Sequence, residues 1–264
     1  MTTMWDDTTG DYLASLRAAG RRPLTVRLHR HYLQHLRRFA PSPTTLTIQA
    51  LERALSARRD WQPETIRSAA GVFRGFTRWL HGRGVFATDP GRMLPAVRVP
   101  EASARPMPDD LLSRLLDALP PSRERWLVLL GAHAGLRAAE IATVSRRSLD
   151  GDLLYVVGKG GKQRVVPIVD DDLLAAICQA DPWLFPGRTD GHLSPGHVSV
   201  LLSRLLPAHW TAHTLRHRAG TVGYVATRDI LAVGRFLGHS KPETTMRYVQ
   251  LPTDALRAVA EAAA

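Results

Sequence analysis

Six side chains in the second half of the sequence form a set that suits attack on a phosphodiester. They are two arginines, a lysine, two histidines and a tyrosine: Arg137, Lys159, His213, Arg216, His239 and Tyr248. Planar guanidinium groups can hold phosphate oxygens bidentately, and such clamping is often the largest catalytic contribution. A tyrosine hydroxyl becomes a nucleophile when a neighbouring base accepts its proton, and a lysine can protonate the departing oxygen. Because the protein supplies the cations, this chemistry requires no metal ion or other cofactor.

Each of these residues also has an ordinary structural interpretation. Arg137 could be a surface residue at a helix start, and Tyr248 could pack near Met246 and Val249 on a helix face. His213 and His217 lie four residues apart, which also suits a metal pair on a helix. We expect no metal there, because the sequence has no HExxH glutamate between them and shows no third ligand.

Order and spacing favour the chemical interpretation. The residues fall in four segments that follow one another as AGLRAAEI, GKGGKQRVVP, HTLRH and LGHSKPETTMRY. This arrangement resembles the tyrosine recombinase, or phage integrase, family, in the compact two-domain form of its Xer-like and Cre-like members. The resemblance is strong from about Met107 to Tyr248 and weak before it. Tyr248 stands nine residues after His239, which is the spacing of the family's nucleophile.

The resemblance implies a mechanism for breaking and rejoining DNA at a specific site. Tyr248 would attack the phosphate and keep a 3′-phosphotyrosine, and Lys159 would protonate the free 5′-hydroxyl. No ATP is implied, because the phosphotyrosine conserves the bond energy. Arg137, Arg216 and His239 would hold the phosphate. His213 would be a further catalytic residue, and Glu140 and His217 would support the site.

The resemblance also implies partners. Exchange between two duplexes of DNA needs four subunits, so a homotetramer on synapsed DNA is expected. The segment after the nucleophile, LPTDALRAVAEAAA, is amphipathic. It either folds back on its own domain or docks on the neighbouring subunit, and the resemblance favours docking. Two other activities stay open: DNA relaxation of the type IB topoisomerase kind, and DNA binding without catalysis by a regulator derived from a recombinase.

The charge of the chain also predicts a nucleic-acid partner. The formal net charge is +11 and the sequence pI is about 10.8. Residues 1–100 hold 16 Lys/Arg and 7 Asp/Glu, against 19 and 17 in residues 101–264. A basic first half beside a second half of nearly balanced charge indicates a DNA-binding domain joined to a domain with a different function. The predicted DNA-binding residues are Arg27, Arg30, Arg37, Arg38, Arg74, Arg78, Lys162 and Arg164.

Hydrophobic periodicity predicts the elements that position these residues. Helices are expected over about 9–19, after the start signal of Pro23 and Thr25, over 45–57 and over 63–81, with His35 at a solvated or phosphate-contacting position. The second half predicts further helices around a β-hairpin, formed by two β-branched runs that flank GKGGKQ. The predicted fold is mainly α with a small antiparallel sheet. The predicted domains are a helical DNA-binding domain over 1–95, a linker over 96–106 and an α+β catalytic domain with a tail helix over 107–264.

Composition excludes several other classes of protein. Cys178 is the only cysteine, so disulfides cannot stabilise the fold and a cysteine-rich metal site is excluded. No apolar run is long enough to span a bilayer, and the first ten residues lack the pattern of a signal peptide. We therefore expect a cytoplasmic protein associated with the nucleoid.

Overall fold

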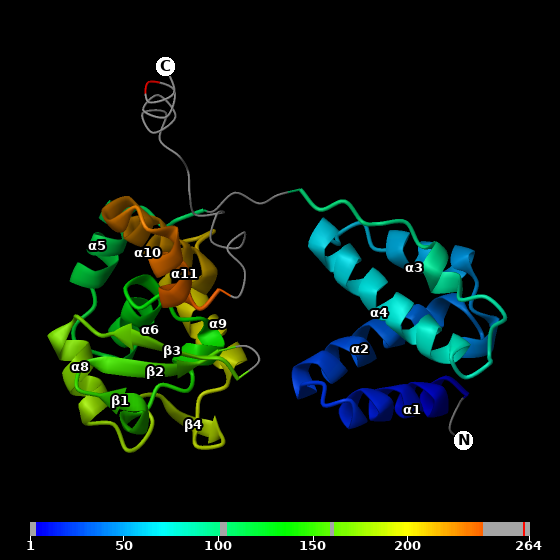
Figure 1. Ribbon diagram of the computed structural model, residues 1–264, viewed down its shortest axis with the longest axis horizontal. Helices are drawn as coiled ribbons and strands as arrows, with labels where there is room; N and C mark the ends of the chain where they lie inside the picture. Colours follow the sequence, from blue (N-terminus) through cyan, green and yellow to red (C-terminus); the bar gives the residue numbers. More distant parts are fainter. Residues whose placement is uncertain (1–3, 101–104, 159–160, 240–260, 262–264) are drawn as a thin grey trace. The chain divides into compact units, whose positions relative to one another are not determined.

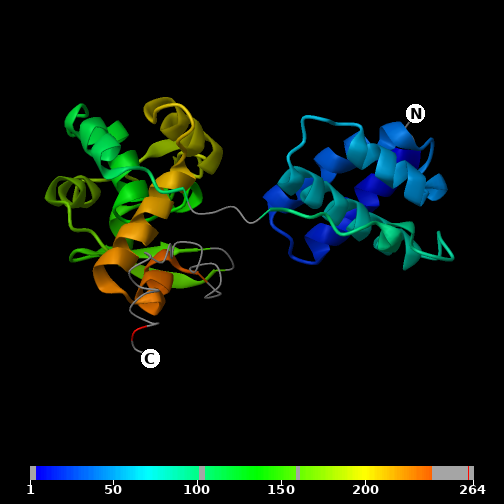
Figure 2. The same cartoon turned by 90° about the horizontal axis from the view of Figure 1, so that it is seen from above.

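The computed structural model describes residues 4–100, 105–158, 161–239 and 261. The chain divides into two compact units, residues 1–101 and 102–264. Figures 1 and 2 show the helices and strands of both units. Each unit packs around its own hydrophobic core. The fold class predicted from the sequence, mainly α with a small antiparallel sheet, is confirmed. Among the described residues, no helix is both long and apolar enough to cross a membrane.

The first unit is a bundle of four α-helices, with two short 3₁₀ turns between the second and third helices and one after the fourth. Proline or a side-chain cap begins each of the last three, as Thr47 does by accepting a hydrogen bond from the Ala50 N–H at 3.2 Å. The apolar faces meet in a core that contains Leu36, Leu51, Phe73 and Phe76, all fully buried. The helices are α1 (Met4–Ala18), α2 (Pro23–Leu36), α3 (Ile48–Ser56) and α4 (Pro63–His81).

Two sequence predictions for this unit were wrong. The first helix begins at Met4, five residues before the expected start, because Trp5 belongs to the core. Its ring stacks on Phe76 and its Nε1 donates to the Ala40 carbonyl at 3.0 Å. His35 is neither solvated nor free to contact phosphate, since it is buried with its Nε2 2.7 Å from the Ala54 carbonyl oxygen.

The second unit places helices around a central helix and a three-stranded sheet. Every residue of α6 from Trp126 to Ala132 is buried, and α6 contacts α7, α9 and α10. Figure 1 shows α6 between α10 and the sheet. The helices are α5 (Asp109–Asp117), α6 (Arg123–Ala132), α7 (Ala138–Ile141), α8 (Asp171–Cys178), α9 (Pro195–Leu205), α10 (Ala212–Thr227) and α11 (Ile230–Leu237).

The sheet is antiparallel in the order β1-β2-β3, and its hairpin is the one predicted from the sequence. Tyr155 of β2 lies opposite Val165 of β3, and both are exposed. Leu154 and Val166 form the next pair and point into the core, as strand alternation requires. Two short strands were not predicted, because runs of two and four residues carry no periodic signal. The strands are β1 (Leu149–Asp150), β2 (Leu153–Val157), β3 (Gln163–Pro167) and β4 (Pro186–Thr189).

Candidate active site

A buried carboxylate, Glu140, is the centre of the candidate site. Arg137 is the N-cap residue of α7, and Glu140 is the third residue of that helix. Glu140 accepts hydrogen bonds from the backbone N–H and from Nη1 of Arg137, both at 2.9 Å. The Glu140 side chain is 3% exposed, whereas that of Arg137 is 37% exposed. The carboxylate therefore orients Arg137 from the protein side and leaves part of the guanidinium open to a ligand.

Arg216 approaches the same carboxylate from α10. Its side chain is 1% exposed, and its Nη1 lies 3.8 Å from a Glu140 carboxylate oxygen. The guanidinium also donates to the backbone carbonyls of Gly135 and Leu237. Gly135 has a φ of +62°, and a Cβ at this position would lie 2.7 Å from Leu237 Cδ2. A glycine is therefore required where the chain turns its carbonyl toward Arg216.

A third arginine, Arg164 of β3, makes a bidentate pair with Glu140. Its Nη1 and Nη2 donate to the two carboxylate oxygens at 2.9 and 2.8 Å, and its Nε donates to the Phe236 carbonyl at 2.8 Å. Burial alone would raise the pKa of Glu140. The hydrogen bonds from Arg164 and from the Arg137 backbone, with the charges of both guanidinium groups, outweigh it and lower that pKa below its ordinary value. Glu140 is therefore ionised and partly neutralises the arginines.

His239 follows directly from the end of α11. Gly238 ends that helix in the left-handed conformation, with a φ of +66°, and the His239 N–H donates to the Gly234 carbonyl at 2.9 Å. Burial, followed by the positive charges of Arg216, Arg137, Arg164 and His213, lowers the pKa of His239 to about 4. The imidazole is therefore neutral at neutral pH and can accept a proton.

His213 and His217 lie on consecutive turns at the start of α10, with their ring centroids 4.2 Å apart. His217 Nδ1 accepts a hydrogen bond from the Arg105 N–H at 3.1 Å. Two residues further on, the Met107 N–H donates to the Thr214 carbonyl at 3.4 Å. The segment that enters the second unit is thus anchored on the helix that carries His213 and Arg216.

The structure therefore brings together four residues that the sequence singled out at distant positions: Arg137, Glu140, Arg216 and His239. Lys159 and Tyr248 lie outside the described residues. The base of the hairpin turn next to Lys159 is described: the Gly158 N–H donates to the Lys162 carbonyl at 2.8 Å. A Cβ at Gly158 would lie 3.5 Å from Glu140 Oε1, so this base packs directly against the carboxylate.

The predicted DNA-binding residues fall into two groups. Six are exposed: Arg27 and Arg30 on α2, Arg37 and Arg38 after it, Arg78 on α4 and Lys162 in the hairpin turn. Three side chains, that of Arg37 among them, have intramolecular partners. Arg37 lies 3.1 Å from the Asp6 carboxylate on the surface, and Arg74 donates to the Leu94 and Pro95 carbonyls. Arg164 is buried against Glu140, so its geometry does not fit the DNA contact predicted from the sequence.

Known proteins share both the sequence and the fold. Residues 106–254 match the model of the phage integrase family. Tyrosine recombinase XerC of Xanthomonas campestris pv. campestris is 31% identical over 224 residues, which cover 78% of this chain and 70% of that protein. Tyrosine recombinase XerC of Neisseria meningitidis serogroup B is 30% identical over 274 residues, with 92% and 90% covered.

Two solved structures share the fold at low sequence identity. A lambda integrase dimer bound to a COC′ core site has a TM-score of 0.76 and 16% identity, with 92% of this chain and 76% of that chain covered. The XerH site-specific recombinase bound to difH substrate has a TM-score of 0.68 and 17% identity, with 90% and 78% covered. On the family match and on the identity to the XerC proteins, this chain belongs to the phage integrase family, as a tyrosine-type site-specific DNA recombinase.

Proposed function

We propose that this recombinase cleaves DNA through Tyr248 and keeps a 3′-phosphotyrosine while strands are exchanged. In this mechanism Arg137, Arg216 and His213 bind the non-bridging oxygens of the scissile phosphate. His239 binds the phosphate or accepts the proton of the tyrosine hydroxyl. Lys159 gives a proton to the departing 5′ oxygen, and a 5′-hydroxyl from the partner strand later reverses the attack. Bond energy is conserved in the phosphotyrosine, so the reaction uses no ATP.

The convergence of two arginines on one buried carboxylate carries this proposal. Arg137 and Arg216 come from elements that are distant in sequence, and their shared partner Glu140 fixes both guanidinium groups in advance. Preorganised cations of this kind stabilise the charge that develops on a phosphate in the transition state. The lowered pKa of His239 keeps a neutral base beside them.

A nicked suicide substrate tests the proposal directly. DNA that carries the sequences flanking the gene is incubated with the purified protein in EDTA without ATP, and then resolved on a denaturing gel. We expect a protein–DNA band that survives SDS and carries the 3′ end of the cut strand. Tyr248→Phe should abolish this band while DNA affinity is kept, because the substitution removes only the hydroxyl.

Other outcomes of the same assay favour the alternatives. Tight, salt-sensitive binding to these sequences without a covalent band would contradict the proposal for this site and favour a protein that only binds DNA. Relaxation of supercoiled plasmids of arbitrary sequence would favour the activity of a type IB topoisomerase.

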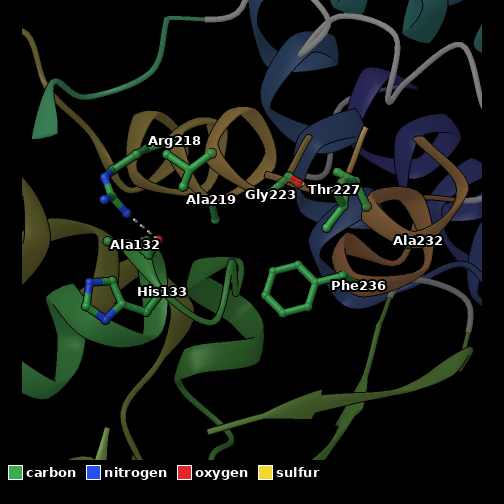
Figure 3. Close-up of a pocket in the computed structure, with 10 residues that line it drawn as sticks. Ala132, His133, Arg218, Ala219, Gly223, Thr227, Ala232 and Phe236 are labelled. Carbon is green, nitrogen blue, oxygen red and sulfur yellow. Dashed lines mark hydrogen bonds between the residues drawn. The ribbon is translucent and has the colours of Figure 1, made fainter. Parts of the chain in front are cut away.

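We also propose that the protein acts as a tetramer on double-stranded DNA and that the tail after Tyr248 docks on the neighbouring subunit. An apolar cavity of about 390 Å³ between α6, α10 and α11 supports this docking. Phe236 extends into it from α11, and Ala219 and Gly223 line it on α10 (Figure 3). Val222, which lines the cavity, and Leu231 are 39% and 62% exposed. An amphipathic segment with Leu256 and Val259 has the apolar side chains to cover such a surface.

Assembly on DNA tests the docking. A chain that ends at residue 250 should still bind a single site but should no longer form tetramers on paired sites in mass photometry. Val222→Asp in the cavity should have the same effect, whereas Val169→Asp is the matched control, because Val169 is 81% exposed and does not line the cavity. Tetramers that persist in the truncated chain would contradict the docking and leave the catalytic proposal unaffected.

A further inference from the structure

We infer that Arg164 is a positioning residue, which fixes the end of α11, and with it His239, against the Arg137–Glu140 pair. This inference rests on the proposed function, since it assigns Arg164 to the support of that active site. The sequence alone suggested that Arg164 contacts DNA, as a basic residue beside the Gly-rich turn. Its contacts assign it a different role.

The burial of Arg164 argues against a contact with phosphate. Its side chain is 8% exposed, and each of its three nitrogen atoms donates to a partner within the protein at 2.8 or 2.9 Å. Binding a phosphate would require it to leave Glu140, whose carboxylate would then lose its bidentate partner in a buried position. A guanidinium that is hydrogen-bonded at all three nitrogens fixes the relative positions of the segments that it contacts.

Two of those segments carry catalytic residues. On one side, Arg164 shares Glu140 with Arg137, at 2.9 Å from the same oxygen, Oε1. On the other side, its Nε donates a hydrogen bond to the Phe236 carbonyl, and Arg216 donates one to the next carbonyl, that of Leu237. These are the last carbonyls of α11, which lack partners within the helix. The two guanidinium groups therefore set where α11 ends.

Gly238 brings the following residue into the same assembly. A Cβ at Gly238 would lie 2.9 Å from Arg164 Cδ and 3.1 Å from its Nη1, so the backbone passes directly over the Arg164 side chain. His239 is the next residue. Any movement of Arg164 thus displaces the backbone of its neighbour Gly238, and His239 moves with it.

The chemistry of the contacts makes arginine the required residue. A lysine ammonium in place of the guanidinium keeps the positive charge beside Glu140. It cannot donate to both carboxylate oxygens and to the Phe236 carbonyl in the same planar arrangement. The charge-conserving variant Arg164→Lys therefore separates the geometric role from the electrostatic one.

The experiment measures the rate of covalent-complex formation and the salt dependence of DNA binding for Arg164→Gln and Arg164→Lys. We expect the rate to fall about 100-fold in the Gln variant, because a displacement of about 1 Å at reacting groups costs about that much. In the Lys variant the rate of covalent-complex formation should fall at least tenfold. The slope of log K against log salt should stay at the wild-type value in both, because no phosphate contact is lost. Arg114→Gln, which removes an exposed arginine of α5, is the charge-matched control and should change neither quantity.

Titration of His239 by NMR adds a measurement that mere destabilisation would not change. The charged or titratable groups that lower its pKa are Arg216, Arg137, Arg164 and His213. The pKa of His239 should rise in Arg164→Gln, which removes one of these charges. In Arg164→Lys the His239 ring signals should shift, because the backbone that carries the ring moves. If the Gln variant does not fold, the Lys variant, which keeps a cation beside Glu140, decides the question.

Three results would overturn the inference while the wild type still forms its adduct. The first is a rate within threefold of wild type in Arg164→Lys. The second is a slope of log K against log salt that is smaller in magnitude by about one in the Arg164 variants, which would show that Arg164 contacts a phosphate. The third is unchanged His239 signals in Arg164→Lys. Absence of the covalent adduct in the wild type itself would contradict the proposed function instead.

Discussion

Removal of the charge on Glu140 should destabilise the second unit by about 3–5 kcal/mol, the cost of breaking a buried ion pair by removing one partner. In Glu140→Gln the side chain keeps its shape, but one carboxylate oxygen becomes an NH₂ group. Each of those oxygens accepts two hydrogen bonds at 2.8–2.9 Å, so the NH₂ group would face two donors of Arg137 and Arg164. Arg164 and Arg216, which are 8% and 1% exposed, would then lose their counter-charge. Folded domains are stable by only about 5–15 kcal/mol, so this loss is large.

Denaturant titration combined with hydrogen exchange and mass spectrometry measures this effect, because peptides from the two units are followed separately. Glu124→Gln on α6 is the matched control. Its side chain is 36% exposed and its partner Arg123 is 51% exposed, so we expect a loss of at most about 1 kcal/mol. A loss below about 1 kcal/mol in Glu140→Gln would refute the argument that this carboxylate compensates the buried arginines. Equal destabilisation of peptides from residues 4–100 would refute the assignment of the effect to the second unit.

Three further predictions concern pH, backbone conformation and the first unit. Because the folded-state pKa of His239 is about 4, below the ordinary 6.5, the unfolded chain binds more protons between these values. The stability that neutral His239 contributes should therefore be fully present above about pH 6.5 and be lost as the pH falls toward 4, and His239→Gln should flatten this part of a stability–pH curve. Gly135→Ala should lower the free energy of unfolding by about 2–4 kcal/mol in a denaturant titration, because of its positive φ and of overlap with Leu237. Gly151→Ala, at a φ of +59° with open space around it, should lower it by only about 1 kcal/mol. Arg74→Ala should increase hydrogen exchange around Leu94 and Pro95, whose carbonyls it binds; unchanged exchange there, with Arg78→Ala as control, would show that these bonds do not hold the segment.

Periodicity predicted the elements well where they are long and amphipathic. The helices α2 and α4 start at Pro23 and Pro63, as the sequence indicated, because proline is favoured at the first helical position. The start of α1 was missed, since Trp5 buries itself through tertiary contacts with Phe76 and Ala40 that no local pattern contains. The four-residue helix α7 and the strand β1 are too short to show a period.

The candidate site was predictable as a set of residues but not as a geometry. Motif spacing identified Arg137, Glu140 and Arg216, yet nothing in the sequence shows that a single carboxylate serves three arginines. The sequence does carry a signal for the position of Arg164. It stands two residues before the fully buried Val166 on β3, and alternate residues of a strand share a face. That alternation indicates an inward-pointing arginine, which in turn needs a buried acid as partner.

The place of Arg216 has a practical consequence for work with inactive protein. An arginine that is 1% exposed and binds the Gly135 and Leu237 carbonyls joins the turn between α6 and α7 to the end of α11. Replacing it with alanine would leave a cavity and two carbonyls without their donor, so lost activity and lost folding would appear together. Under the proposed mechanism, Tyr248→Phe is the better way to make a decoy that occupies sites without cutting them, because it removes a single oxygen atom. Inactivating changes found in natural variants at Arg216 should accordingly lower the amount of the protein as well as its activity.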